Sequence, residues 1–164
     1  MSWRSTSSDW SRVRLEPLYR LTFHYPESWF VELDDERGIE SEHFLIAEGQ
    51  CEGRITGRMR GANRPRRRTD MTYQPDFNGV IETDDGATIL FHLQGRGRPN
   101  KGRVIGFSTH VSSDERYKWL NDGVCALAGE VRERSARTDI VLDVADLVWE
   151  PLSERPSYDS RNGN

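Results

Sequence analysis

Residues 80–94, VIETDDGATILFHLQ, are the stretch that decides the fold. Two runs rich in β-branched and apolar residues lie on either side of Asp85-Gly86. An Asp-Gly pair between such runs is a strong local signal for a β-hairpin, because glycine supplies the positive φ that a tight turn needs. The sequence therefore predicts an antiparallel hairpin here, with its second strand over residues 88–94.

Similar alternation of apolar and polar residues recurs on both sides of this hairpin. The further predicted strands cover residues 18–24, 53–61, 103–111, 124–131 and 138–149. They are joined by Gly/Asp turns and show no βαβ periodicity, which favours a sandwich or a barrel. Glycines inside the strand patterns, such as Gly95 and Gly106, suit the bends of a barrel wall. We predict an all-β fold: a single antiparallel β-barrel of roughly eight strands.

One short helix is predicted near residues 113–121. Ser113-Asp114 is an N-cap signal, and Asn121-Asp122-Gly123 is a stop signal. We interpret Trp119 on this helix as a plug of the core, with a platform for substrate as the alternative.

Length and composition indicate one barrel domain over residues 12–152. We expect flexible tails at 1–11 and 153–164, because both are polar and lack an apolar period. No stretch approaches the roughly 20 apolar residues that span a bilayer, and residues 1–30 lack the apolar core of a signal peptide. We therefore expect a cytoplasmic protein with no membrane partner, and with Cys51 and Cys125 as buried, reduced thiols.

The net charge of −4 argues against non-specific nucleic-acid binding. The basic cluster Arg64-Pro65-Arg66-Arg67-Arg68 is local and lies between strand-like segments. It is either a solvated loop or an arginine gate that attracts a carboxylate or phosphate to a pocket mouth.

Five segments resemble a known family. They are LEPLYRL at 15–21, GRITGRMRG at 53–61, IETDDGA at 81–87, YKWLN at 117–121 and DIVLDV at 139–144. In this order they resemble the DUF3237 family, also called UPF0311, over about residues 13–150. The resemblance implies a small β-barrel and no settled activity. The stretch Asp76-Phe77-Asn78-Gly79 departs from the family pattern, which often has Arg and Tyr there, so the substrate of a relative should not be transferred.

The sequence holds no recognisable motif for metal, cofactor or nucleophile. The four histidines show no HxH, HExxH or 2-His-carboxylate spacing, and there is no GxSxG elbow. The stretch Gly95-Arg96-Gly97-Arg98 opens no predicted helix, so we interpret it as a turn and not a phosphate loop. We expect no metal site and no cofactor.

General acid/base chemistry in the barrel interior fits the residues better. Polar side chains share strand faces, although the sequence does not decide which faces point inward. The candidate catalytic residues are His92, His110, Asp76 and Asp70. The candidate substrate-binding residues are Arg58, Arg60, Tyr73, Glu82, Gln94 and Trp119.

Two functions remain open. The first is a cofactor-independent enzyme that binds a small cyclic or aromatic metabolite and catalyses acid/base isomerisation, cyclisation, elimination or hydration. The alternative is a non-catalytic small-molecule-binding or assembly protein. The sequence also allows a homodimer.

Overall fold

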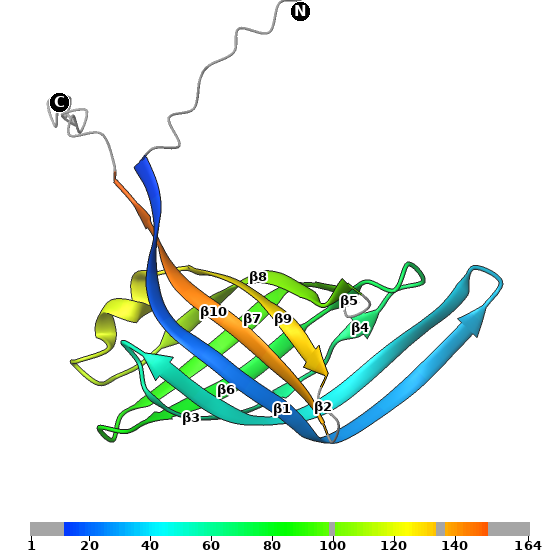
Figure 1. Ribbon diagram of the computed structural model, residues 1–164, viewed down its shortest axis with the longest axis horizontal. Coiled ribbons are helices and arrows are strands. Elements are labelled where there is room, and N and C mark those ends of the chain that lie inside the picture. The colour runs from blue at the N-terminus through cyan, green and yellow to red at the C-terminus, as the bar shows by residue number, and fades with distance from the viewer. Residues whose placement is uncertain (1–11, 99–100, 134–136, 151–164) are drawn as a thin grey trace, which may run out of the picture.

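The computed structural model describes residues 12–98, 101–133 and 137–150, so the two expected tails lie outside the described residues. Most described residues belong to antiparallel strands (Figure 1). In chain order the elements are β1 (Val13–Asp35), β2 (Gly38–Gly53), β3 (Gly57–Asn63), β4 (Arg66–Arg67), β5 (Tyr73–Gln74), β6 (Asp76–Thr83), β7 (Thr88–Arg98), β8 (Arg103–Val111), the 3-10 helix η3 (Lys118–Asp122), β9 (Cys125–Glu133) and β10 (Thr138–Trp149).

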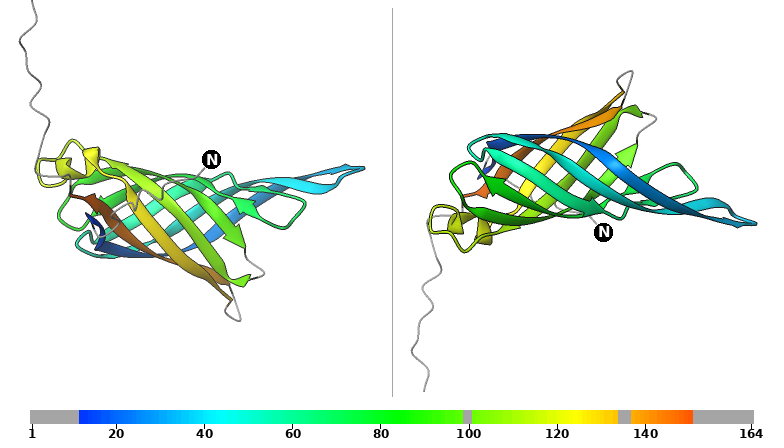
Figure 2. Two further views of the ribbon diagram at one scale, coloured as in Figure 1. Left: turned by 90° about the horizontal axis from the view of Figure 1, so that it is seen from above. Right: turned by 90° about the horizontal axis from the view of Figure 1, so that it is seen from below.

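The eight long strands close into a ring. The antiparallel pairs run β1–β10–β9–β8–β7–β6–β3–β2, and β2 pairs back to β1. Figure 2 shows the resulting tilted barrel from two sides. The predicted antiparallel barrel is confirmed. The two-residue strands β4 and β5 form a further path between β2 and β7.

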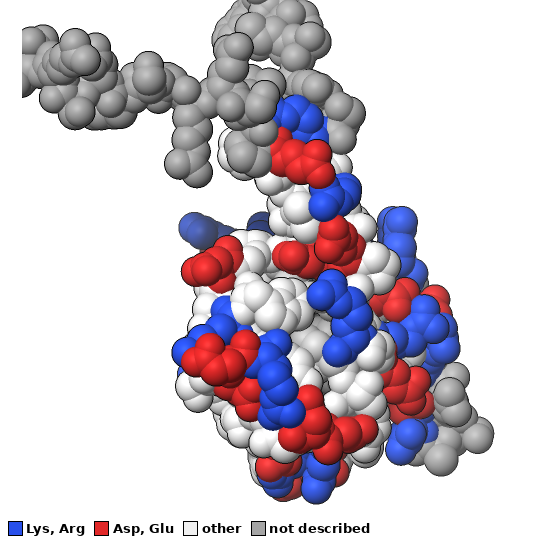
Figure 3. All heavy atoms as spheres, turned by 90° about the vertical axis from the view of Figure 1, so that its left-hand side faces the viewer, with Lys and Arg blue, Asp and Glu red and all other residues white. Residues whose placement is uncertain are grey.

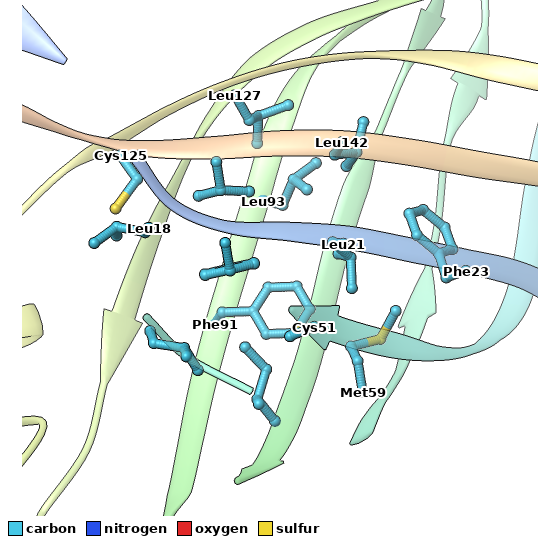
Figure 4. Close-up of a cluster of buried hydrophobic side chains, with 14 of the residues drawn as sticks. Leu18, Leu21, Phe23, Cys51, Met59, Phe91, Leu93, Cys125, Leu127 and Leu142 are labelled. Atoms are coloured by element: carbon cyan, nitrogen blue, oxygen red, sulfur yellow. The ribbon is translucent and has the colours of Figure 1, made fainter. Parts of the chain in front are cut away.

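The apolar face of most strands points into the barrel. On β8 the inward residues are instead Ser108 and His110, whereas Ile105 and Phe107 are exposed. Leu21 and Phe23 of β1 face the interior together with Phe91 and Leu93 of β7 (Figure 4). Their side chains are at most 4% exposed. Burying one such side chain stabilises the fold by about 2 kcal/mol, so the interior is in large part an ordinary hydrophobic core.

Gly95 of β7 and Gly106 of β8 lie opposite each other in the barrel wall. A Cβ on Gly106 would come within 2.1 Å of the Gln94 carbonyl oxygen. Only glycine allows this close approach of two backbones.

The predicted short helix near residues 113–121 is confirmed, in 3-10 form. Turns lead into the single 3-10 helix η3, and no α-helix forms there. Leu120 is the residue that plugs the core, at 3% exposure, whereas Trp119 is 41% exposed. The interpretation of Trp119 as a core plug is wrong, because its ring lies outside beneath the Arg54 guanidinium, 4.8 Å from ring centroid to Cζ.

The predicted strand at 53–61 is in fact a hairpin. β2 ends at Gly53 and β3 begins at Gly57, and the turn between them contains the buried Ile55. The Arg54 backbone N–H donates to the Leu18 carbonyl at 2.7 Å, which ties this turn to β1.

β1 and β2 continue past the barrel as a long hairpin (Figure 1). β10 pairs with β1 only as far as His24, whereas β2 pairs with β1 as far as Asp35. The segment 26–44, which lies outside the predicted strands, is therefore mostly extended. Its large apolar side chains remain exposed, namely Trp29, Phe30, Val31, Leu33, Ile39 and Phe44.

The basic cluster belongs to the barrel rim. The chain leaves β3 after Asn63, pairs through β4 with β2 and through β5 with β7, and returns at Asp76. Arg66 pairs with Glu40, and the Arg67 Nη2 lies 3.9 Å from the Glu32 carboxylate. The cluster is thus part of a strand-paired rim and is not a free loop.

At the opposite end of the barrel, near η3, charges of both signs are interspersed (Figure 3). Arg116 pairs there with Asp114 and Asp85, and Lys118 pairs with Glu115. Among the described residues, no helix is long and apolar enough to cross a membrane.

Candidate functional site

A β-bulge in β1 aims Tyr25 into the barrel. The pairing with β2 shifts between His24 and Glu27, so that Tyr25 and Pro26 together lie opposite a single β2 residue. Proline lacks a backbone N–H and is tolerated at such a break in a strand ladder. Tyr25 therefore continues the inward face of Phe23, just where β1 leaves the barrel wall.

Asn63 holds the Tyr25 hydroxyl. Its Nδ2 donates to the Tyr25 oxygen at 2.8 Å, and its Oδ1 accepts the Asp76 backbone N–H at 3.1 Å. This second bond fixes the orientation of the amide. Because the Tyr25 oxygen accepts from Asn63, its own O–H proton remains free to be donated. Burial raises the pKa of Tyr25 to about 12, so the phenol keeps this proton at neutral pH.

These two groups border a cavity of about 300 Å³ at the rim end of the barrel. The wall is mainly apolar and aromatic, and three of its residues come from the rim segment between β3 and β6. The lining residues are Phe23, Tyr25, His43, Leu45, Asn63, Pro65, Tyr73, Pro75, Phe77, Leu93, Gly97, Val104, Val131, Thr138, Ile140 and Leu142. A concave apolar wall with a few polar groups is the usual form of a small-molecule site.

His43 of β2 contributes a titratable imidazole to the cavity wall. Its Nε2 lies 2.8 Å from the Ser41 hydroxyl, and its ring lies between Phe30 and Tyr73, with centroid distances of 5.8 and 5.5 Å. Burial and the nearby Arg67 cation lower the pKa of His43 below its usual 6.5. The imidazole is therefore neutral at pH 7 and able to accept a proton.

His110 lies in the barrel core, away from the residues that line this cavity. Its Nε2 lies 2.7 Å from the Tyr19 hydroxyl, and its Nδ1 lies 3.6 Å from the Cys125 sulfur. Burial lowers the pKa of His110 to about 4. Ser108 lies on the same inward face of β8 and is equally buried. Cys51 and Cys125 are both free and buried, as expected.

His92 and Asp76 meet on the outer surface. Their Nε2 and Oδ1 atoms are 2.7 Å apart, and the two side chains are 39% and 52% exposed. The expectation that His92 and His110 share one interior is wrong. The physical reason is the alternation of β7: Ile89, Phe91 and Leu93 take the inward face and force His92 outward.

Most of the other predicted binding residues also face outward. Arg60 pairs with Glu82 at 3.1 Å, and Arg58 lies 4.0 Å from Glu48. Gln94 lies on the same outer face of β7 as His92, and Asp70 lies on the rim, where its carboxylate accepts the Thr72 backbone N–H. These residues and Trp119 do not reach the cavity, so Tyr73 is the one predicted site residue that lines it.

The sequence reasoning missed Tyr25, His43 and Asn63. Two of them lie just past the ends of predicted strands, at the next position of the alternation. Tyr25 follows Phe23 on the inward face, and Asn63 follows Met59 and Gly61. Among the residues that the structure describes, no three His, Cys, Asp or Glu side chains come together to hold a metal ion.

Fold and site together define a small closed antiparallel β-barrel with a mainly apolar cavity at its rim end. The chain belongs to the DUF3237 family, a family of proteins of unknown function whose model matches residues 13–147. No curated protein matches the sequence.

Several solved structures share the fold. A β-barrel-like protein from Acinetobacter baumannii AYE is 20% identical, with a TM-score of 0.64 over 82% of this chain and 96% of that one. An enzyme from Penicillium herquei is 21% identical, with a TM-score of 0.56 over 88% and 99% of the two chains. The pterocarpan synthase dirigent protein GePTS1 is 8% identical, with a TM-score of 0.53 over 92% and 98%.

Proposed function

We propose that the rim-end cavity binds a small, mainly apolar ring compound that carries one hydrogen-bond acceptor, and that the protein acts on it by acid/base chemistry without a cofactor. The observation that carries this proposal is the Tyr25–Asn63 hydrogen bond inside an otherwise apolar and aromatic wall. A volume of about 300 Å³ is at the small end for ligand pockets and suits one or two fused rings.

Tyr25 is the donor in this proposal, and Asn63 positions it. The Tyr25 O–H donates to a ligand carbonyl oxygen and stabilises the negative charge that develops there. His43, neutral at pH 7, takes a proton from the carbon next to the carbonyl. The C–H electron pair becomes the enolate, and return of the proton to a different carbon completes an isomerisation. The base that the sequence suggested at His92 or His110 is thus assigned to His43.

Two of the similar structures bear on this proposal. One is an enzyme from Penicillium herquei, and the other is a pterocarpan synthase dirigent protein. Because these likenesses lie at or below 21% identity, they support a shared barrel, and the substrate must be sought from the cavity itself. Binding without catalysis is the second candidate, which the dominance of apolar side chains in the wall favours.

Exchange of α-protons tests the proposal without a known substrate. 1-Tetralone and other two-ring ketones are incubated with the full chain in D2O, and loss of the α-CH2 signal is followed by NMR. We expect enzyme-dependent exchange that falls about 100-fold in Tyr25→Phe and in His43→Gln. His24→Gln, on the outer face beside Tyr25, is the matched control and should leave the exchange rate unchanged.

Binding of the same ketones is measured in parallel against their hydrocarbons, for example tetralin for 1-tetralone. Preference for the ketone that is lost in Tyr25→Phe, without any exchange, would favour the non-catalytic alternative. If no ketone in the panel binds better than its hydrocarbon, the role of Tyr25 is refuted.

A further inference from the structure

The extension of β1 beyond the barrel has an open edge. Among the described residues, the segment 27–35 pairs only with β2, because the pairing of β1 with β10 stops at His24. Half of the backbone N–H and C=O groups of this segment therefore point away from β2 and lack a strand partner. An unpaired edge of this length is a template for a further strand.

The same segment exposes large apolar side chains on both of its faces. Trp29 and Val31 lie on one face and are 53% and 64% exposed, while Phe30 lies on the other at 64%. Leu33 adds a fourth at 52% exposure. Proteins usually protect an edge strand with charged residues, proline or a covering element. Here three consecutive apolar residues occupy the middle of the edge.

We propose that this edge is a dimer interface, where β1 of one copy pairs with β1 of a second copy about a two-fold axis. The two hairpins then form one continuous four-stranded antiparallel sheet between two barrels. In such an isologous interface, residue i of one copy faces residue j of the other, and residue j of the first copy faces residue i of the second. The residue at the centre of the interface must therefore lie opposite the same residue of the second copy.

The charges of the segment exclude two of the registers that its middle residues allow. A centre at Val31 places Glu27 opposite Asp35, and a centre at Glu32 places two glutamates face to face. Like charges directly opposite each other are destabilising. A centre at Phe30 pairs Trp29 with Val31 on each side and opposes no two carboxylates over residues 27–33.

Figure 1 and Figure 2 show that the hairpin projects well past the rest of the barrel. An isolated two-stranded hairpin is only marginally stable in water, and further strands with apolar contacts stabilise it. Pairing with a second copy would give each hairpin two additional strands.

Cross-linking of the full chain tests the interface and its register together. Directly opposed strand residues lie close enough for a disulfide, so Phe30→Cys should form a covalent dimer under mild oxidation. Leu33→Cys is the matched control, because Leu33 is similarly exposed but lies opposite Glu27 of the partner. The native thiols of Cys51 and Cys125 are buried and should not interfere.

Light scattering gives the second readout. The unmodified chain should show twice its 19.0 kDa mass at micromolar concentration. Phe30→Lys, which opposes two lysines, should raise the dimer dissociation constant about tenfold or more while leaving the circular dichroism spectrum unchanged. A monomer at all concentrations overturns the interface. Equal cross-linking of Phe30→Cys and Leu33→Cys, or faster cross-linking of Val31→Cys, overturns the register.

Discussion

Burial of His110 makes the stability of the barrel depend on pH between about 4 and 6.5. The folded protein binds a proton at His110 only near its lowered pKa of about 4, whereas the unfolded chain binds one near the usual 6.5. The unfolded state therefore gains the proton first as the pH falls. The stabilisation is complete above pH 6.5 and is lost as the pH falls toward 4. This difference in pKa corresponds to about 3 kcal/mol.

His110→Gln removes the titrating group while keeping a polar side chain beside Tyr19. The free energy of unfolding is measured by urea denaturation at pH 7 and pH 4.5. We expect the unmodified protein to lose about 2.5 kcal/mol more between these two pH values than the variant does.

His24→Gln is the control for this measurement, because His24 lies on the outer face of β1. It should retain the full pH dependence of the unmodified protein. Carboxylates with lowered pKa values, such as Asp114 at about 2, contribute equally to all three proteins and cancel in the comparison. Equal pH dependence of His110→Gln and the unmodified protein would refute the reasoning.

Three further outcomes follow from the barrel wall and core. Phe91→Ala should lower the free energy of unfolding by about 3–5 kcal/mol in urea titrations, because Phe91 is 4% exposed and stacks on Phe77. A loss below about 1 kcal/mol would contradict this packing. Gly106→Ala should prevent folding or lower the melting temperature severely, whereas Gly97→Ala, whose Cβ would meet its nearest atom at 3.7 Å, should be tolerated in the same assay. Burial raises the pKa of Cys51 to about 12 and of Cys125 to about 11. Neither thiol should therefore react with a chromogenic disulfide at pH 8 until urea is added. Rapid reaction of the native protein would contradict the buried placement of these thiols.

The barrel was predictable because burial of one face of a strand places apolar residues at every second position of the sequence. The Asp-Gly turn and the alternation of Ile89, Phe91 and Leu93 gave both the hairpin and, in hindsight, the direction of its inward face. The direction itself stayed open from the sequence, because polar His92 and Gln94 alternate with these apolar residues along the same strand. In the structure the apolar face of β7 points inward, because burying it stabilises the fold whereas burying unpaired polar groups costs free energy.

The hairpin past Pro26 was unpredictable for the converse reason. Alternation reports burial on one face, and this segment is exposed on both, so Trp29, Phe30 and Val31 follow one another without a period. The bulge at Tyr25 depends on the register with β2, which the local sequence does not encode. The part of the site that escaped prediction is therefore the part set by pairing between distant segments.

Tyrosine-selective ¹³C NMR tests the central claim, that the rim-end cavity is the binding site, most directly. On titration with 1-tetralone, the ring signals of Tyr25 and Tyr73 should shift, because both residues line the cavity. Those of Tyr19, buried beside His110, and of Tyr117, bonded to Asp85 near η3, should stay in place. Shifts at Tyr19 or Tyr117 while Tyr25 stays unchanged would contradict the account.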